Sequence, residues 1–337
     1  MTHGRRSRVL VVGGAGYIGS HCCKRLSAAG FEPVVYDNLS TGHREFVKWG
    51  PFVEGDIRDG GLLGRVLREH APVAVMHFAA LALVGESVSE PSKYWNVNVG
   101  GVLSLLDAMR GAGVDKLVFS STCAVYGEPE TVPIDEQIPK NPVNPYGASK
   151  LAAERMIEDF GPAYGLRSVR LRYFNACGAD PGLEIGEDRE IETHLIPLVL
   201  DAALERRPSI GVFGSDYPTP DGTAIRDYIH VVDLADAHVK ALEYLLEGGE
   251  TIAVNLGTGQ GASVSEIIAE AERTVGHPIV QEKRARRAGD PAVLVAAPAL
   301  AGEVLRWRAQ RSDLPTIMAD AWAWHLCRFG SQERSKA

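Results

Sequence analysis

Apolar residues along the first half of the chain follow two alternating patterns. Short apolar runs have the length of β-strands, and the unbroken ones are typical of parallel strands covered on both faces. These runs lie at residues 9–12, 33–36, 52–53, 73–80, 116–121 and 166–174. Between them, apolar residues recur at helical spacing, as at Val99, Val102, Leu106 and Met109. The alternation predicts an α/β fold with a doubly wound parallel sheet of the Rossmann type, which binds ligands at the carboxyl ends of its strands.

The pattern changes after Asn175. A stretch rich in glycine and acidic residues follows, and we expect it to lead into a smaller C-terminal α/β lobe. Helical patterns recur at residues 193–205, 232–246, 265–275 and 316–328. The residues at 251–256 have the pattern of a strand that can return to the sheet. We therefore predict a first domain at 1–178, joined again by 226–256, and a lobe at 179–337 that ends in a polar tail.

The first predicted strand runs directly into a cluster of glycines. Gly14, Gly16 and Gly19 have the spacing G-x-G-x-x-G, and a helical pattern begins at Ile18. Between a strand and a helix, such glycines form a tight turn and let the backbone approach a pyrophosphate at the free N–H groups of the helix. A purely structural turn can have the same sequence, but the flanking elements favour nucleotide binding.

A carboxylate ends the second predicted strand. Asp37 is placed to accept hydrogen bonds from an adenosine ribose and would repel a 2′-phosphate, so NAD is favoured over NADP. The alternative is an ordinary acid in a strand-end turn. Asp56 follows the next strand, where it can face the adenine amino group or simply cap a helix.

Three side chains form a candidate catalytic group. Thr122 follows the strand at 116–121, and Tyr146 and Lys150 are four residues apart at the start of a predicted helix. Residues at this spacing share one helical face, so the ammonium and an oxidised nicotinamide would both favour the phenolate of Tyr146. We expect a pKa lowered toward working pH for Tyr146, while Thr122 holds a reacting hydroxyl. A surface Tyr/Lys pair is the alternative.

Composition limits the partners of this site. The net charge of −8 disfavours binding to nucleic acid. The apolar stretch near the start is too short for a signal peptide or a membrane span, so we expect a cytoplasmic protein that does not bind membranes. The five cysteines and ten histidines form no C-x-x-C pair and no metal-ligand spacing, so unpaired thiols and no metal site are expected.

A basic cluster stands out in the last third of this acidic chain. We interpret Lys283, Arg284 and Arg286 as a solvated charged face. Arg287, close to Asp290, is a candidate for pairing with a diphosphate together with Arg226, because the planar guanidinium can bind phosphate oxygens bidentately.

Several blocks together carry a family resemblance. They are Gly-Gly-Ala-Gly-Tyr-Ile-Gly at 13–19, Tyr-Asp-Asn-Leu at 36–39, Glu-Gly-Asp-Ile at 54–57, Val-Gly-Glu-Ser at 84–87, Asn-Pro-Tyr-Gly-Ala-Ser-Lys at 144–150, Leu-Arg-Tyr-Phe-Asn at 171–175 and Asp-Gly-Thr-Ala-Ile-Arg-Asp-Tyr-Ile-His-Val at 221–231. From about Val9 to His325 the chain resembles the UDP-glucose 4-epimerase family of extended short-chain dehydrogenase/reductases. The block at 221–231 is far more specific than the glycine loop.

The resemblance implies specific roles for many residues. Catalysis is implied for Thr122, Tyr146 and Lys150. Contacts with a firmly held NAD are implied for Gly13, Gly16, Tyr17, Ile18, Gly19, Asp37, Asn38, Asp56, Ile57, Phe78, Ala79, Asn98, Tyr146, Lys150 and Phe174. Contacts with a UDP-sugar are implied for Thr122, Tyr146, Asn175, Leu195, Phe213, Arg226, Arg287 and Asp290. A homodimer formed through helices at about 91–110 and 147–160 is implied as well.

The implied activity is the interconversion of UDP-glucose and UDP-galactose through a transient 4-keto sugar, with Tyr146 as acid and base. Related sugar-nucleotide dehydratases place an Asp-Glu pair after the active hydroxyl, whereas this chain has Cys123 and Ala124 there, which disfavours elimination. Leu294, at a position linked to substrate size in the family, leaves 4-epimerisation of UDP-pentoses or UDP-N-acetylhexosamines open. A regulator that binds NAD without catalysis is a further alternative, against which Tyr146 and Lys150 argue.

Overall fold

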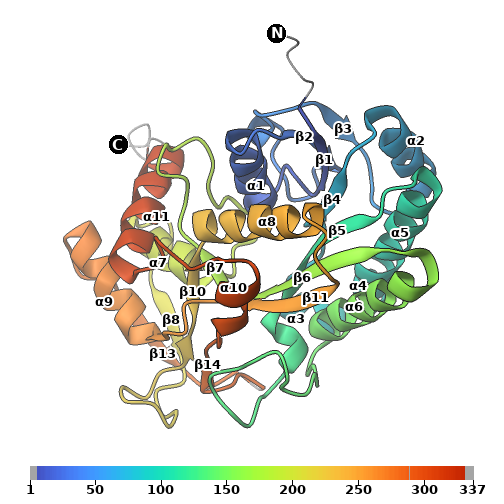
Figure 1. The fold of residues 1–337 in the computed structure, drawn as a ribbon. Helices are drawn as coiled ribbons and strands as arrows, with labels where there is room; N and C mark the ends of the chain where they lie inside the picture. The colour runs from blue at the N-terminus through green and yellow to red at the C-terminus, as the bar shows by residue number, and fades with distance from the viewer. Residues whose placement is uncertain (1–5, 288, 331–337) are drawn as a thin grey trace.

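A seven-stranded parallel sheet forms the centre of the computed structural model, which describes residues 6–287 and 289–330 (Figure 1). All six pairings between neighbouring strands are parallel. Listed across the sheet, the strands are β3 (Phe52–Glu54), β2 (Glu32–Asp37), β1 (Arg8–Val12), β4 (Ala74–His77), β5 (Lys116–Thr122), β6 (Arg167–Tyr173) and β11 (Ile252–Leu256). The order reverses between β1 and β4, where doubly wound sheets bind their ligands. The predicted fold class is confirmed.

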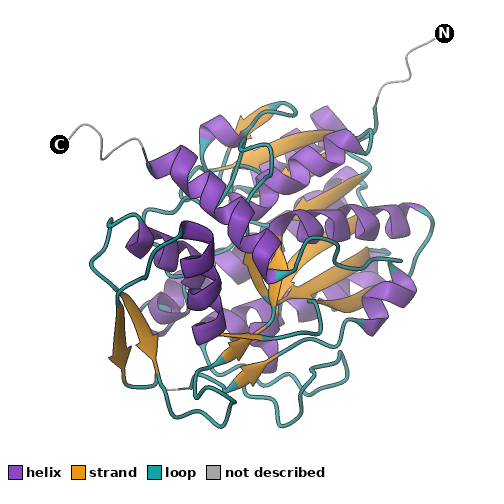
Figure 2. Cartoon of the chain, turned by 90° about the vertical axis from the view of Figure 1, so that its left-hand side faces the viewer, coloured by secondary structure: helices purple, strands orange, loops and turns teal. Residues whose placement is uncertain are grey.

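Helices cover both faces of this sheet (Figure 1 and Figure 2). On one face lie α1 (Tyr17–Ala28), α8 (Val231–Leu246) and α10 (Ala299–Val304). On the other lie α2 (Gly60–His70), α5 (Gly101–Ala112) and α6 (Pro145–Tyr164). Val9 and Val11 of β1 pack in the first core, and Leu10 and Val12 pack in the second. Burial on both faces explains why β1 is apolar without alternation.

The C-terminal lobe has a separate hydrophobic core. It contains α7 (Leu195–Ala203), β8 (Ile210–Phe213), α9 (Val264–Val275), β13 (Gln281–Arg284) and α11 (Leu314–Phe329). Three small sheets complete it: β10 (Tyr228–His230) with β7 (Asn175–Cys177), β13 with β8, and β9 (Ile225–Arg226) between β12 (Ala262–Ser263) and β14 (Val293–Leu294). Helix α9 begins with a capping box, in which Ser263 and Glu266 each accept a backbone N–H bond.

The chain crosses between the two parts more than once. Strand β10 pairs with β7 outside the main sheet, whereas α8 packs against α1 and β11 pairs with β6 at the sheet edge.

The first five residues, Ala288 and the polar tail beyond Gly330 lie outside the described residues, so the expectation of a frayed tail is not tested.

The helix predicted over residues 91–109 is three consecutive segments. They are α4 (Pro91–Tyr94), a π-helical segment (Trp95–Gly100) and α5, preceded by α3 (Val84–Ser89). The π-helical segment contains Asn98, whose side chain bonds to both backbone groups of Leu81 and to Ser149. Two short 3-10 turns lie elsewhere in the described part of the chain, at Arg44–Phe46 and Cys123–Tyr126. None of the helices within 6–287 and 289–330 is both long and apolar enough to span a bilayer.

Candidate active site

The glycine loop after β1 leaves almost no room for side chains. Gly13 has a φ of +83°, and a Cβ there would lie 2.5 Å from the backbone nitrogen of Ala79. A Cβ on Gly19 would lie 2.1 Å from the carbonyl oxygen of Gly13. At Gly16, in contrast, the nearest atom would be 3.5 Å away. The turn itself therefore requires glycine at positions 13 and 19. The space next to Gly16 is not filled by the protein, so a ligand can approach the backbone there.

The amino end of α1 is free to bind an anion. Gly16 is the N-cap residue of α1, and no side chain caps the helix. Asp37 at the end of β2 holds the loop in place, because its two carboxylate oxygens accept hydrogen bonds from the backbone N–H of Ala15 (2.9 Å) and Leu39 (2.8 Å). Burial raises the pKa of Asp37, and these two bonds oppose the rise. Each oxygen can accept a further hydrogen bond, so Asp37 can support the loop and still bind a ribose.

The other predicted cofactor residues surround the same edge of the sheet. Asn38 bonds to Asp56 (3.2 Å), whose pKa is held low by Arg58. Phe78 and Ala79 follow β4, and their N–H groups both donate to Val12 at the end of β1. Tyr17 in the first turn of α1 donates to the carbonyl of Gly178 (2.6 Å).

Three of the predicted cofactor side chains are engaged within the protein. Ile57 packs in the core beside Gly101, and Phe174 is buried next to Val125 and Ile134. Asn98 is buried and bonded to Leu81 and Ser149. A direct contact of these residues with NAD stays a prediction.

The three candidate catalytic residues come together where β5 ends and α6 begins. Asn144 caps α6 by accepting a bond from the N–H of Gly147 (2.8 Å). A Cβ on Gly147 would lie 2.5 Å from the carbonyl oxygen of Ala124, so the first turn of α6 packs directly on the turn that follows Thr122. This close approach brings Tyr146 to Thr122, whose side chain interacts with the phenol. Both Thr122 and Lys150 are buried.

The electrostatics of this group differ from the prediction. Burial raises the pKa of Tyr146 well above its usual value, and the neighbouring hydroxyl of Thr122 offsets only part of the rise. Burial also lowers the pKa of Lys150 to about 7, against the opposing charge of Glu154. The ammonium lies 4.3 Å from the ring centroid of Phe119. The expected lowering of the Tyr146 pKa is therefore not produced by the protein's own charges, because desolvation outweighs them; it needs a cationic ligand.

The predicted substrate residues other than Thr122 and Tyr146 lie on the C-terminal lobe. Arg226 pairs with Asp290, and the guanidinium of Arg287 lies 4.0 Å from the ring centroid of Phe213. Arg226 acts electrostatically on Cys123, the residue after Thr122, so this lobe faces the catalytic group. Asn175 begins β7 directly after β6, and Leu195 begins α7. Within the basic cluster, Arg284 pairs with Glu282 and Arg286 with Asp216, all exposed, as expected for a charged face.

A cluster of charges before α7 was not anticipated. Nδ1 of His194, the N-cap residue of α7, lies 2.8 Å from Glu187 and 3.1 Å from Glu192, and Arg189 also pairs with Glu187. The two carboxylates raise the pKa of His194 to about 9. Ligand atoms of Glu187, Glu192 and His194 lie within 4.8 Å of one another, but Arg189 and the imidazolium already neutralise the carboxylates, so we assign no metal. In the sequence, the acidic residues at 184–192 followed by His194 could have indicated this cluster.

The charge of His194 predicts a pH-dependent stability. Because the folded pKa of about 9 exceeds the unfolded value of 6.5, His194 contributes its full stabilisation below pH 6.5 and loses it as the pH rises through 9. We expect His194→Gln to lower the free energy of unfolding most at pH 6 and little above pH 9.5, measured by urea denaturation at several pH values. A difference between the two proteins that does not change with pH would contradict the charge assignment.

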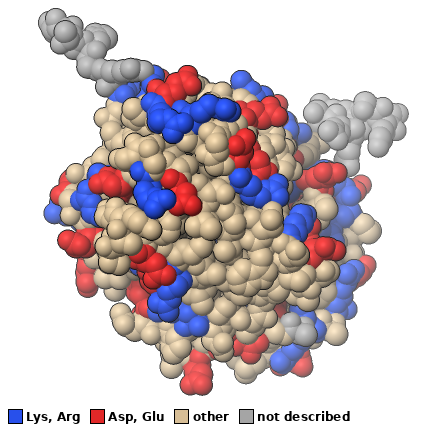
Figure 3. Space-filling model, turned by 90° about the vertical axis from the view of Figure 1, so that its right-hand side faces the viewer, with Lys and Arg blue, Asp and Glu red and all other residues tan. Residues whose placement is uncertain are grey.

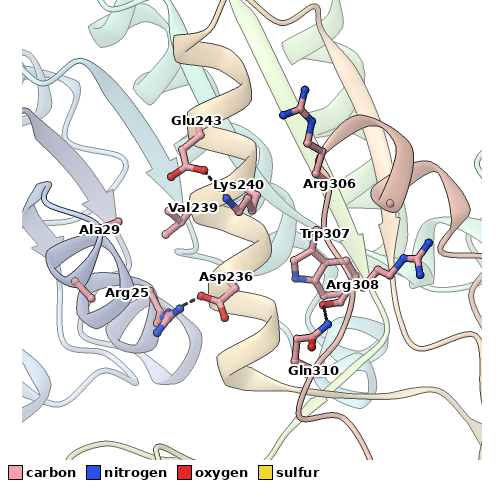
Figure 4. Close-up of a pocket in the computed structure, with 12 residues that line it drawn as sticks. Arg25, Ala29, Asp236, Val239, Lys240, Glu243, Arg306, Trp307, Arg308 and Gln310 are labelled. Carbon is pink, nitrogen blue, oxygen red and sulfur yellow. Dashed lines mark hydrogen bonds and ion pairs between the residues drawn. The ribbon is translucent and has the colours of Figure 1, made fainter.

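A groove of about 830 Å³ lies away from these residues, between α1, α8 and the segment after α10 (Figure 4). Its charges are largely paired internally, Arg25 with Asp236 and Lys240 with Glu243. It contains none of the predicted catalytic, cofactor or substrate residues. An active site at the carboxyl edge of the sheet, outside this groove, stays our prediction.

Comparisons with known proteins match this chain to one family over most of its length. Residues 9–257 match the model of the NAD dependent epimerase/dehydratase family. A UDP-glucose 4-epimerase of Rhizobium meliloti (strain 1021) is 55% identical over 324 residues, which are 96% of this chain and 98% of that protein. The crystal structure of UDP-glucose 4-epimerase from Brucella ovis in complex with NAD is 56% identical, with a TM-score of 0.93 over 94% of this chain and 98% of that chain. That of UDP-glucose 4-epimerase from Bifidobacterium longum in complex with NAD+ and UDP is 38% identical, with a TM-score of 0.91 over 96% and 99%.

Proposed function

The chain belongs to the NAD dependent epimerase/dehydratase family, and we propose that it is an NAD-dependent UDP-glucose 4-epimerase that interconverts UDP-galactose and UDP-glucose. The observation that carries the proposal is the meeting of Thr122, Tyr146 and Lys150 at the sheet edge that also holds the open glycine loop. An acid–base phenol beside a dinucleotide site is suited to removing a hydride and a proton from one alcohol carbon.

The residues present fit NAD. The uncapped start of α1 and the open side of Gly16 suit a pyrophosphate, and Asp37 suits an unmodified ribose. NAD held by these residues would supply a reversible hydride acceptor for C4 of the sugar. Its positive nicotinamide would also supply the charge that lowers the pKa of Tyr146.

The chain's own residues handle the proton and the position of the sugar. The phenolate oxygen of Tyr146 takes the proton of the 4-hydroxyl as the ketone forms, and returns it when the ketone is reduced. Oγ1 of Thr122 holds that oxygen by a hydrogen bond, and Lys150 stabilises the phenolate. We propose that UDP is bound by six residues: Asn175, Leu195, Phe213, Arg226, Arg287 and Asp290. Because these contacts hold the nucleotide and not the hexose, the keto sugar can rotate while UDP stays bound.

Elimination of water is disfavoured in this site. The turn after Thr122 begins with Cys123 and Ala124, and burial raises the pKa of the Cys123 thiol to about 12. Neither side chain can act as the acid and base that removal of water from the sugar would require. The ketone is therefore reduced again at C4, with no net oxidation.

The test is to incubate the purified protein with UDP-galactose, without added NAD, and to measure UDP-glucose. We expect conversion to an equilibrium mixture; absence of any product, also after NAD is supplied, would contradict the proposal. Parallel incubations with UDP-xylose and UDP-N-acetylglucosamine define the substrate range. A regulator without catalysis would bind UDP-sugars and convert none of them.

We also propose that the protein is a homodimer formed through α5 and α6. The face that carries these helices has a central surface with few charged side chains (Figure 3). Exposed apolar side chains on this side of the fold are Val88 (65% exposed), Tyr164 (53%), Trp95 (43%) and Leu103 (43%). Apolar surface of this kind is typical of subunit interfaces.

The dimer proposal predicts that a charge at Leu103 separates the subunits. We expect light scattering to give the mass of two chains for the wild-type protein and of one chain for Leu103→Glu, because an interface cannot bury an unpaired carboxylate cheaply. Leu246→Glu, at an exposed position on α8, is the control and should leave the mass unchanged.

We place the protein in the cytoplasm, which the five free cysteines support.

A further inference from the structure

A buried ion pair connects α6, which carries Tyr146 and Lys150, to β6. The side chains of Glu154 and Arg172 are 2% and 5% exposed, and Nε of Arg172 lies 2.9 and 3.2 Å from the two carboxylate oxygens of Glu154. Ser121, next to Thr122, donates its hydroxyl proton to the same carboxylate. Arg172 in turn donates to the hydroxyl of Tyr126 (3.0 Å). A charge at this depth is costly unless it is paired in this way.

The pair joins α6 and β5, the two elements that carry the catalytic residues, to β6. Glu154 lies on α6 one helical turn after Lys150, Ser121 ends β5 together with Thr122, and Arg172 lies on β6. Residues four apart on a helix are neighbours on one face, and the charge of Glu154 acts on the ammonium of Lys150. The sequence already indicates this arrangement, because Tyr146, Lys150 and Glu154 follow one another at intervals of four residues.

We propose that Glu154 is a positioning residue for Lys150, and that its carboxylate, fixed by Arg172 and Ser121, keeps the neighbouring ammonium charged and in place. The proposal rests on the function assigned to Lys150 above and deepens it. Arg172 and Ser121 thereby act on the reaction only through Glu154.

The charges around Lys150 explain why one carboxylate matters. From β4, His77 faces Lys150, but burial lowers the pKa of His77 to about 3, so it stays neutral. From β5, Lys150 meets the ring of Phe119, and on its own helix it has Tyr146 and Glu154. From β6, Arg172 and Arg170 act on Glu154. Among the described residues, Glu154 is thus the one anion that offsets the desolvation of Lys150.

The matched comparison is between two glutamates of the same helix. Glu154→Gln keeps the size and the hydrogen-bonding capacity but removes the charge near Lys150. Glu158→Gln is the control, because Glu158 forms the equivalent pair with Arg170 one turn further from the site. Both variants lose one ion pair between α6 and β6, and only the first loses the charge next to Lys150.

The direct readout is the pKa of Lys150, measured by NMR on protein with 13Cε-labelled lysines and assigned with Lys150→Arg. We expect Glu154→Gln to lower this pKa by about one unit and Glu158→Gln to leave it unchanged. In the holoenzyme, the fall of kcat on the alkaline side should move to lower pH by a similar amount in Glu154→Gln alone. Glu154→Asp should restore part of the shift.

A second variant covers the risk that an unpaired Arg172 prevents folding. Glu154→Gln combined with Arg172→Met removes both charges, and we expect it to keep the lowered pKa of Lys150. A wild-type pKa in either the single or the double variant would overturn the proposal. A wild-type protein that is inactive on UDP-galactose would contradict the proposed function instead, and the NMR measurement would still decide the role of Glu154.

Discussion

Replacing Tyr146 by phenylalanine is expected to lower kcat for UDP-galactose by about 10²- to 10⁴-fold, the range that positioned acid–base groups contribute. The change removes one oxygen atom and keeps the aromatic ring, so we expect it to leave the fold and the nucleotide contacts intact. The rate of conversion to UDP-glucose measures the loss, and a UDP titration should give an unchanged Kd. Loss of rate with an unchanged Kd would separate chemistry from binding.

The same helix offers a control for this experiment. Tyr164 lies in the last turn of α6 and is 53% exposed, far along the helix from Thr122. We expect Tyr164→Phe to keep at least half of the wild-type kcat. If Tyr146→Phe also retained that much activity, Tyr146 would not be the acid and base, and the proposed mechanism would be wrong.

Gly19→Ala is expected to remove NAD from the purified protein. The added Cβ would lie 2.1 Å from the carbonyl oxygen of Gly13 and 2.9 Å from Cα of Gly14, so the glycine loop must open where the pyrophosphate binds. Overpacking of this kind costs on the order of 1–3 kcal/mol, and here it acts directly on the binding loop. We expect the NAD content, read from absorbance after acid release, to fall at least tenfold.

Gly111→Ala is the matched control, because an added Cβ at Gly111 in α5 would meet nothing within 4 Å. This variant should keep its NAD and be at least as stable as wild type, since alanine favours a helix more than glycine does. Full retention of NAD in Gly19→Ala would show that the loop does not hold the cofactor.

The central sheet could be predicted because its signals are local. Each parallel strand is an apolar run buried on both faces, and each is followed by a helix or a turn with its own pattern. The helix at 91–109 was predicted as one element, but it contains a π-helical segment at Asn98. That distortion depends on contacts with Leu81 and Ser149, which no local pattern reveals.

The pKa of Tyr146 shows the limit of reasoning from spacing. The spacing of Tyr146 and Lys150 correctly puts them on one face of α6, but their pKa values depend on how much water the surrounding elements exclude. Burial raises the pKa of Tyr146 and lowers that of Lys150, so it disfavours both the phenolate and the ammonium that the reaction uses. Only the packing of β4, β5 and β6 against α6 determines this.

The sequence by itself determined the fold class and the turn at Gly13–Gly19, since these depend on periodicity and on residues close together along the chain. It also predicted Thr122, Tyr146 and Lys150 as the catalytic residues. The tertiary structure decided which distant charges meet: Arg226 with Asp290, and Arg172 with Glu154. Ion pairs in a folded protein act over a few ångströms in space, whereas the partners of Arg226 and Arg172 are 64 and 18 residues away along the chain. Folding alone brings them together and removes the water that would otherwise screen them.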